Sequence, residues 1–462
     1  MIKIYNSLTR REEEFKSLEP EKVKMYVCGP TVYDYPTVGN WRTYTMGDIV
    51  NRTLRYFGYD VHYIINLTDV GHLTGDNLGD ADVGEDRIEK TISNTGKTAK
   101  EITDFYIADF FTGFEKMNFI KPDKFTRATE YIQEQIDLIK KLEEKGFTYR
   151  ISDGIYFDAS KYPDYGKLSG LKVDEIQEGA RVEKNPEKKN ANDFALWKFS
   201  PNDGAKREQE WNSPWGVGFP GWHLECSAMI LKELGETIDI HGGGEDLRMI
   251  HHQNEIAQSE SATGKKFVNY WMHGSFINID GGKMGKSLGN AYTIQDLEAK
   301  GFSAIDLKFF YMNSIYRSKQ NFTWEALQSA KNGLDGIKNK IKLLGNEKGN
   351  INARFVEEFK EKISDDFNIP QALAVLHEVL KSDISNPDKL ATVLDFDRVL
   401  GLKLDEVRED KIPQEIIKLA EDRKVAKQEK NFELADNIRS QINEAGYEVE
   451  DLPGGDFKIL KK

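Results

Sequence analysis

Two cysteines, a histidine and a glutamate stand where they could bind one metal ion. His251 and Glu255 are four positions apart, so their side chains would share one face of a helix. Cys226 falls near the start of an expected helix, where the helix dipole favours a thiolate, and Cys28 ends an expected strand. Zinc accepts thiolate, imidazole and carboxylate ligands together in tetrahedral geometry. The four residues are therefore candidate ligands of one zinc ion per chain.

The alternative for each of these residues is packing in a core. The chain has only two cysteines, far apart, which make no disulfide framework, and a lone buried cysteine usually behaves as a small apolar residue. A lone histidine is more often a hydrogen-bonded core residue than a ligand. Five of the eight histidines, however, lie in the window that also holds Cys226, namely His223, His241, His251, His252 and His273. This concentration favours a site.

Two glycine-containing segments have the composition of a nucleotide site. Thr37-Val38-Gly39-Asn40 opens an expected helix, where free N–H groups favour phosphate and a glycine lets a nucleotide approach the backbone. Lys283-Met284-Gly285-Lys286-Ser287 lies among glycines, and such a loop can close on a triphosphate and neutralise developing charge. Each segment alone is commonplace as a helix start or a turn. Together they indicate ATP binding.

A third segment, His241-Gly242-Gly243-Gly244-Glu245-Asp246, follows an expected strand. Its glycines would permit close contact with a ligand ring, and a carboxylate one turn later could accept hydrogen bonds from ribose hydroxyls. The alternative is a plain glycine turn in which Asp246 caps a helix. The segment by itself does not decide between the two.

The elements that must position these residues have a βαβ pattern. A strand over Val23 to Val27 is followed by a helical pattern that opens at Gly39 and Asn40 and stops at Gly58, and then by a strand over Val61 to Leu67. Parallel sheets are built from such units, and ligands bind beyond the carboxyl ends of their strands. Cys28 and Thr68 fall at those ends.

The remaining elements predict an insertion and a helical C-terminal region. Residues 119–212 are expected to form the insertion, with a helix, a β-rich stretch and a charged link at Ala128 to Lys145, Thr148 to Phe157 and Glu183 to Asp193. The α/β pattern resumes over Trp222 to Leu234, Thr237 to His241, a helix from about Met249, and Phe267 to Met272. Beyond Trp324 the pattern is mainly helical, and it closes with a hairpin over Tyr447 to Leu460.

Length and charge limit the function classes. A chain of 462 residues is expected to hold about three domains. No apolar run is long enough to span a membrane or to form a signal peptide, so a cytoplasmic protein is expected. The net charge of -13 weighs against a protein coated in nucleic acid. A local basic path could still exist, and Arg423, Lys424, Lys427 and Lys430 are candidates, with a solvated helix face as the alternative.

Taken together, the motifs resemble those of the cysteinyl-tRNA synthetases, which are class I aminoacyl-tRNA synthetases, along nearly the whole chain. The matching stretches are Cys28 to Asp34, Asp193 to Lys198, Ser213 to Ala228, His241 to Ser259 and Tyr270 to Asn290. The resemblance implies a Rossmann-type parallel-sheet catalytic domain with an insertion, followed by a mainly helical region. It also implies zinc on Cys28, Cys226, His251 and Glu255, where zinc would bind the substrate thiolate and serine could not compete as a soft ligand.

The same resemblance assigns roles to further residues. ATP would bind to Thr37, Gly39, Asn40, Asp246, Lys283, Lys286 and Ser287. Of these, Thr37, Asn40, Lys283 and Lys286 would take part in catalysis, with Lys286 on the phosphates, a magnesium ion beside them and Asp246 on the ribose. Thr68 and Trp222 would enclose the amino acid. Arg317 resembles, more weakly, a position that contacts tRNA. The implied partners are L-cysteine, ATP and tRNA(Cys), and a monomer is expected.

The resemblance implies a division of the chain into six parts. The two halves of the catalytic domain would be 1–118 and 213–275, separated by the insertion 119–212. A loop and stem-contact region, a helical bundle and an anticodon-binding module would follow at 276–323, 324–403 and 404–462.

Two departures from the family pattern bear on activity. The first ATP motif of the family normally begins and usually ends in histidine, where this chain has Thr37 and Asn40, and Gly285 stands where serine is usual. A threonine hydroxyl and an asparagine amide can still donate hydrogen bonds, and some tryptophanyl enzymes have a similar motif. These departures suggest one alternative, a non-catalytic paralogue that binds zinc and RNA. A second alternative is a ligase that transfers cysteine to a small amine, but relatives of that kind lack the C-terminal tRNA module expected here.

Overall fold

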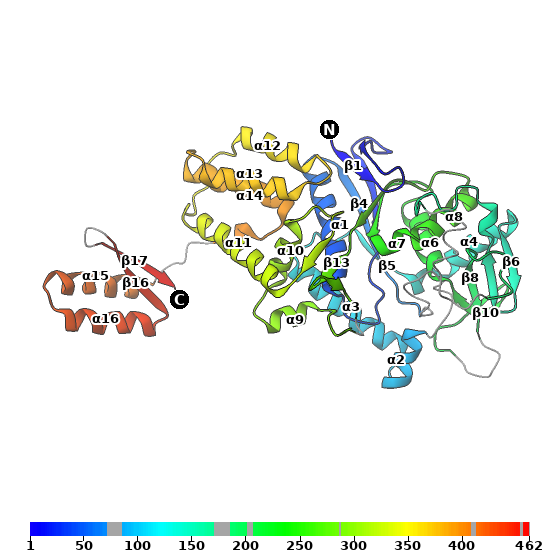
Figure 1. Cartoon of the computed structure of the whole chain (residues 1–462), viewed down its shortest axis with the longest axis horizontal. Helices are drawn as coiled ribbons and strands as arrows, with labels where there is room; N and C mark the ends of the chain where they lie inside the picture. The colour runs from blue at the N-terminus through cyan, green and yellow to red at the C-terminus, as the bar shows by residue number, and fades with distance from the viewer. Residues whose placement is uncertain are drawn as a thin grey trace.

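The protein is described from a computed structural model of the whole chain (Figure 1). The structure describes residues 1–71, 86–170, 185–200, 207–285, 288–407, 413–452 and 456–461. Lys286 and Ser287, both expected to bind ATP, lie outside these ranges, as does the turn of the C-terminal hairpin.

A five-stranded parallel sheet forms the centre of the catalytic domain. Its strand order is β12-β11-β3-β4-β5, and every neighbouring pair is parallel. The strands are β3 (Lys22–Val27), β4 (Asp60–Leu67), β5 (Lys124–Arg127), β11 (Ile238–Gly244) and β12 (Val268–Gly274). The helix α1 (Val38–Tyr56) connects β3 to β4. The βαβ unit and the α/β fold class expected from the sequence are thereby confirmed.

Apolar residues at helical and strand spacing account for this arrangement. Val23, Met25 and Val27 of β3 are buried in the same core as Trp41 and Leu54 of α1. The aromatic helix α3 (Ala99–Lys116) packs against α1, with the Trp41 and Phe110 rings stacked 5.6 Å apart. The start of α1 is thus held firmly beside the carboxyl end of β3.

In sequence, an antiparallel sheet comes between the two halves of the parallel one. Its order is β6-β7-β8-β10-β9, and its strands are β6 (Thr148–Ile151), β7 (Gly154–Phe157), β8 (Phe194–Phe199), β9 (Trp211–Ser213) and β10 (Gly216–Pro220). The helix α4 (Ile132–Glu144) covers it and shares its core. β5, which lies within the expected range 119–212, pairs with β4 in the parallel sheet. The four residues of β5, KFTR, have no apolar run that would have marked a strand.

The glycines of the segment His241 to Asp246 do not form a turn. They are the last residues of β11, and the short helix α7 (Glu245–Arg248) begins directly after them. A Cβ atom on Gly243 would lie 2.6 Å from the His252 ring, so a side chain there would displace that histidine. The glycines therefore make room at the sheet edge for residues of α8 (His251–Thr263).

The C-terminal half is mainly helical. Its helices are α9 (Ile294–Ala299), α10 (Ala304–Met312), α11 (Trp324–Lys342), α12 (Ala353–Ile363), α13 (Ile369–Lys381) and α14 (Asn386–Leu400). A small sheet combines β13 (Ile277–Ile279) and β14 (Gly282–Lys283), which precede α9, with β15 (Gln320–Phe322), which lies between α10 and α11. The described elements also include the strands β1 (Lys3–Asn6) and β2 (Arg11–Glu14) and the helices α2 (Arg87–Thr95) and α6 (Trp222–Glu233).

The last elements form a separate small module, set apart at one end of the molecule in Figure 1. It comprises α15 (Gln414–Gln428), α16 (Phe432–Glu444) and the hairpin β16 (Tyr447–Leu452) and β17 (Asp456–Lys461), with a core of its own. Leu404, at the expected boundary, is fully buried in the core of the preceding helices. No helix in the part of the chain that the structure describes is long and apolar enough to cross a membrane.

Candidate zinc and ATP site

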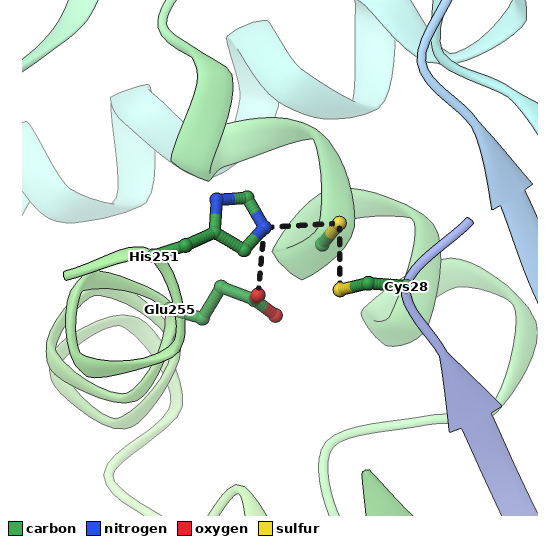
Figure 2. A group of neighbouring side chains, drawn as sticks. Cys28, His251 and Glu255 are labelled. Carbon is green, nitrogen blue, oxygen red and sulfur yellow. Dashed lines mark hydrogen bonds and ion pairs between the residues drawn. The ribbon is translucent and has the colours of Figure 1, made fainter. Parts of the chain in front are cut away.

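The four expected zinc ligands come together from three separate elements. Cys28 follows the last residue of β3, Cys226 lies in α6, and His251 and Glu255 lie one turn apart in α8. Figure 2 shows His251 and Glu255 pointing from α8 toward the end of the strand that carries Cys28. All four side chains are buried, and their ligand atoms lie within 4.8 Å of one another. His251 and Glu255 thus lie on one face of α8, as their spacing in the sequence predicts.

The distances between ligand atoms fit tetrahedral zinc. Zn–S bonds of about 2.3 Å and Zn–N or Zn–O bonds of about 2.0–2.1 Å place neighbouring ligand atoms about 3.3–3.8 Å apart. The two sulfur atoms of Cys28 and Cys226 are 3.9 Å apart. Nε2 of His251 lies 3.4 Å from the sulfur of Cys226 and 3.0 Å from Oε1 of Glu255. Small side-chain shifts would suffice to bind the ion.

The backbone of β3 and β4 fixes the position of Cys28. A Cβ atom on Gly29 would lie 1.7 Å from the carbonyl oxygen of Asn66, so only glycine allows the chain to turn there. The N–H of Gly29 donates to Oδ1 of Asn66 at 2.8 Å, and the N–H of Cys28 donates to the carbonyl of Gly242 at 2.9 Å. Cys28 is consequently held between β4 and β11.

The electrostatics of the cluster also suit a cation. Burial opposes a charge on Glu255, but His241 and His251 outweigh it and lower the pKa of the carboxyl to about 2. Burial likewise raises the pKa of Cys226, but the hydrogen bond with Cys28 and the charge of His251 bring it to about 7. Burial and Cys226 raise the pKa of Cys28. Buried carboxylate and thiolate together call for a positive partner.

Three histidines link Cys28 and Glu255 to the surrounding protein. His252 Nε2 lies 3.3 Å from the sulfur of Cys28, and His252 Nδ1 lies 2.8 Å from His273 Nε2. His273 Nδ1 lies 2.8 Å from the hydroxyl oxygen of Ser7. On the other side, His241 Nε2 lies 2.9 Å from Oε2 of Glu255. Groups of this kind fix the orientation of metal ligands and tune their basicity.

A second set of buried residues has metal-binding geometry. Cys28, His241, His252 and Glu255 also bring ligand atoms within 4.8 Å of one another. The two sets share Cys28 and Glu255, so a single ion cannot use both fully. The first set offers two thiolates and the second only one. Thiolate-rich sites favour zinc.

Two residues expected to enclose the amino acid border the cluster. The ring of Trp222, at the start of α6, lies 4.3 Å from the ring of His251. Thr68, directly after β4, is buried, and its hydroxyl oxygen accepts from the amide of Asn66 at 3.0 Å. The N–H of Thr68 donates to the carbonyl of Pro30 at 3.0 Å, which ties it to the loop after Cys28.

The two expected ATP segments also meet. The N–H of Val38 donates to the carbonyl of Tyr292 at 2.8 Å, and Thr37 forms a β-bridge with Thr293. Gly39 faces Met284, whose terminal carbon lies 2.6 Å from the place of a Cβ on that glycine. Lys283 lies in β14 and is exposed. The glycine-lysine loop therefore starts against the helix terminus expected to hold phosphate.

Asp246, expected to bind ribose, is the second residue of α7. Gly244 occupies the N-cap position, so Asp246 does not cap that helix. Burial raises the pKa of the Asp246 carboxyl. The placement leaves the carboxylate at the carboxyl edge of β11, beside Cys28 and the start of α1.

Comparison with known proteins agrees with this geometry. The sequence profile of the tRNA synthetases class I (C) catalytic domain matches residues 14–332. The chain is 40% identical to the cysteine–tRNA ligase of Treponema denticola over 491 residues, which cover 98% of each chain. The chain belongs to the class I cysteinyl-tRNA synthetase family. A profile of the DALR domain matches residues 358–382 in addition.

Other relatives extend the same result. Cysteine–tRNA ligase 1 of Burkholderia lata is 42% identical over 457 residues, which cover 98% of this chain and 96% of that relative. The structure of Mycobacterium tuberculosis methionyl-tRNA synthetase in complex with methionyl-adenylate matches with a TM-score of 0.55 and 14% identity. That match covers 82% of this chain and 90% of the other, and it shows the class I synthetase fold alone.

Basic side chains at two places that the sequence suggested for RNA binding form ion pairs with carboxylates of the same chain. Arg317 lies 2.6 Å from Oδ2 of Asp366 and 3.2 Å from Oε1 of Glu12. In the C-terminal module, Arg423 and Lys427 both pair with Asp451, at 2.8 Å and 2.7 Å, and Lys424 pairs with Asp456 at 3.3 Å. These pairs attach the hairpin to α15. Three of the four members of the basic cluster are therefore paired with carboxylates of the hairpin, and Arg423 among them is buried rather than on a solvated helix face.

Sequence reasoning missed two groups of this synthetase. His252 and His273 were noticed only as part of the local excess of histidine, which was the available signal. No sequence signal pointed to Ser7, because it lies more than 200 positions from His273, the histidine that it contacts.

Proposed function

We propose that this chain is a cysteine–tRNA ligase in which zinc selects the substrate by its thiolate. The observation that carries the proposal is the convergence of Cys28, Cys226, His251 and Glu255 beside the ATP segments at the carboxyl edge of one parallel sheet. When bound, zinc would supply a soft Lewis acid that accepts a thiolate and discriminates against a hydroxyl. Membership of the cysteinyl-tRNA synthetase family supports the same assignment.

The reaction has two steps. The carboxylate of cysteine attacks the α-phosphate of ATP, which gives cysteinyl-adenylate and pyrophosphate. The terminal ribose hydroxyl of tRNA(Cys) then attacks the carbonyl of the adenylate, takes the cysteinyl group and releases AMP. No side-chain nucleophile is required, so the protein acts by positioning the reactants and stabilising charge.

Separate groups would carry these tasks. Lys283 and Lys286, with a magnesium ion, would neutralise the phosphates, and Asp246 would hold the ribose. Trp222 and Thr68 would enclose the amino acid beside the zinc ligands. The contact of Trp222 with the His251 ring supports this placement.

The C-terminal module supports tRNA as the acceptor. Its small core and its position apart from the catalytic domain suit a part that reaches a distant region of the tRNA. We assign the anticodon contact to α16 and the hairpin, over Phe432 to Leu460, the loop and stem-contact region to 276–323, and the helical bundle to 324–403. The protein is proposed to act as a cytoplasmic monomer.

Cysteine-dependent ATP–pyrophosphate exchange, followed by charging of tRNA(Cys), tests the proposal. The wild-type protein should catalyse both and contain one zinc per chain. Serine in place of cysteine should give almost no exchange, because zinc accepts a thiolate in preference to a hydroxyl. A pocket that sensed shape alone would discriminate against serine poorly. Exchange without charging would indicate a small acceptor, and absence of both would indicate a non-catalytic paralogue.

A further inference from the structure

Cys28 and Glu255 belong to two sets of buried metal-ligand atoms at once. With the other two expected zinc ligands they make the first set. With His241 and His252 they make the second set, whose ligand atoms also lie within 4.8 Å of one another. One ion cannot use both sets, but two ions could share Cys28 and Glu255.

The carboxylate of Glu255 has one oxygen for each set. Oε1 lies 3.0 Å from Nε2 of His251, in the first set, and Oε2 lies 2.9 Å from Nε2 of His241, in the second. Figure 2 shows one oxygen beside the His251 ring and the other turned away from it. An ionised carboxylate accepts on both oxygens, and two-metal sites hold their ions about 3.5–4 Å apart. Glu255 is therefore placed to bridge two cations.

The sulfur of Cys28 also lies between the two sets. It is 3.9 Å from the sulfur of Cys226 and 3.3 Å from Nε2 of His252. A thiolate has lone pairs for two ions, and tetrahedral zinc places neighbouring ligand atoms about 3.3–3.8 Å apart. The distances in the second set thus fit zinc as closely as those in the first.

The surrounding residues hold both rings of the second set in place. The rings of His241 and Trp271 stack 4.6 Å apart. Gly243 leaves room for His252, because a Cβ atom on that glycine would lie 2.6 Å from the ring. The Nε2 atoms of His241 and His252 consequently face the two shared ligands.

Protons can be arranged to leave both Nε2 atoms free for an ion. A neutral histidine that binds through Nε2 carries its proton on Nδ1. Nδ1 of His252 lies 2.8 Å from Nε2 of His273, which can accept, and Nδ1 of His273 can then donate to the hydroxyl oxygen of Ser7. Nδ1 of His241 has no hydrogen-bond partner among the described residues. A proton there is buried and unpaired, so the second set should bind its ion more weakly than the first.

We propose that the second set is a second zinc site, which fills when zinc is in excess and shares Cys28 and Glu255 with the first ion as bridging ligands. His241 and His252 are the ligands that only the second ion uses. Two thiolates and one carboxylate exceed the charge of one zinc ion by one, so the buried cluster with a single ion still attracts a cation. The inference rests on the zinc of the proposed function and adds an ion that this function does not need.

Equilibrium dialysis of the purified wild-type protein against buffered zinc, followed by metal analysis, counts the ions. Zinc per chain should rise from one to two as free zinc increases. His241→Gln should stop at one, because its amide can still donate to Oε2 of Glu255 but is a poor zinc ligand. His62→Gln, the same change at an exposed histidine of β4, is the matched control and should reach two.

Cobalt substitution locates the second ion without any variant. Two high-spin cobalt(II) ions that share a thiolate and a carboxylate are magnetically coupled. The electron paramagnetic resonance signal per chain should therefore fall as the second cobalt binds, whereas two distant ions would double it.

Three results would overturn the inference: zinc that stays at one per chain in the wild type, two ions in folded His241→Gln, or cobalt signals that add. Wild-type protein that binds no zinc, or that shows no cysteine-dependent exchange with one zinc bound, would instead refute the proposed function.

Discussion

The Nε2 atom of His252 lies 3.3 Å from the sulfur of Cys28. Burial and the neighbouring His241 lower the pKa of His252 well below its usual range, so the ring is neutral and carries one proton. The opposite nitrogen faces Nε2 of His273, whose other nitrogen faces the hydroxyl of Ser7. If the Ser7 hydroxyl donates to Nδ1 of His273, then Nε2–H of His273 donates to Nδ1 of His252. The one proton of the His252 ring is then on Nε2, which donates to the sulfur of Cys28.

This chain of donors should stabilise Cys28 as a metal-bound thiolate. His252→Phe removes the donor that contacts the sulfur and should weaken zinc binding about 10–100-fold, as loss of a partner that orients a ligand commonly does. Ser7→Ala, which acts through two rings, should have a smaller effect of the same sign. Chelator competition measures the affinity, and the charge-transfer band of the cobalt-substituted protein reports on the sulfur.

Ser152→Ala is the control for a lost hydroxyl, because Ser152 is an exposed serine of the insertion whose hydroxyl donates to Glu187. Unchanged zinc affinity in His252→Phe would show that the histidine contact does not support the metal site.

Cys226→Ser separates the two possible metal sets. If zinc binds Cys28, Cys226, His251 and Glu255, the variant should lose zinc and cysteine binding far more than ATP binding, because the ATP segments belong to other elements. Metal analysis and separate measurements of cysteine and ATP affinity check this. Full zinc content and cysteine affinity would place the ion on the set that contains His241 and His252 instead. Equal loss of both substrates would indicate a purely structural metal.

The local pattern predicted the catalytic elements well. The helix α1 and the strands β3 and β4 follow directly from apolar spacing, and the interval between His251 and Glu255 predicted their shared face. The proximity of Cys28 and Cys226 could be expected only from the family resemblance, because no local sequence rule relates residues 198 positions apart.

The differences have physical causes. β5 is too short and too polar to be seen in the sequence, and the glycines after His241 suggested a turn although they extend β11 to admit His252. The hydrogen bond that the Thr37 hydroxyl donates to Asn40 at the start of α1 depends on a cap geometry that the sequence permits but does not require. Ion pairs between distant residues, such as Arg317 with Asp366, could not be predicted either, because no local sequence rule relates residues that are far apart in the chain.

Removal of the C-terminal module should separate activation from charging. Truncation after Val407 preserves Leu404, whose side chain is buried in the core of the preceding helices and whose N–H donates to Asp397 at 2.8 Å. The shortened protein should retain adenylate formation and lose much of its tRNA charging. Pyrophosphate exchange and charging of tRNA(Cys) measure the two steps. Loss of exchange in a folded truncated protein would show that the module supports the catalytic domain.

The buried Lys308 joins the helical region to the catalytic domain, and its contribution to the free energy of unfolding should depend on pH. Its ammonium group is fully buried and lies 2.9 Å from Asp48 of α1, 3.3 Å from the carbonyl of Asn118 and 3.3 Å from that of Gly401 at the end of α14. Burial lowers the pKa of Lys308 from 10.5 to about 8, although Asp48 opposes the shift.

The sign of the pH effect follows from that shift. Between pH 8 and 10.5 the unfolded chain keeps the Lys308 proton and the folded protein has released it, so the contribution of Lys308 to stability rises with pH. Relative to Lys308→Met, the free energy of unfolding of the wild type should increase by about 2 kcal/mol from about pH 7.5 to 9.5. Urea unfolding at the two pH values measures this difference, and Lys16→Met, at an exposed lysine, should show none. A difference between wild type and Lys308→Met that is constant over this range, or that falls, would mean that Asp48 and the two carbonyls keep the buried ammonium protonated.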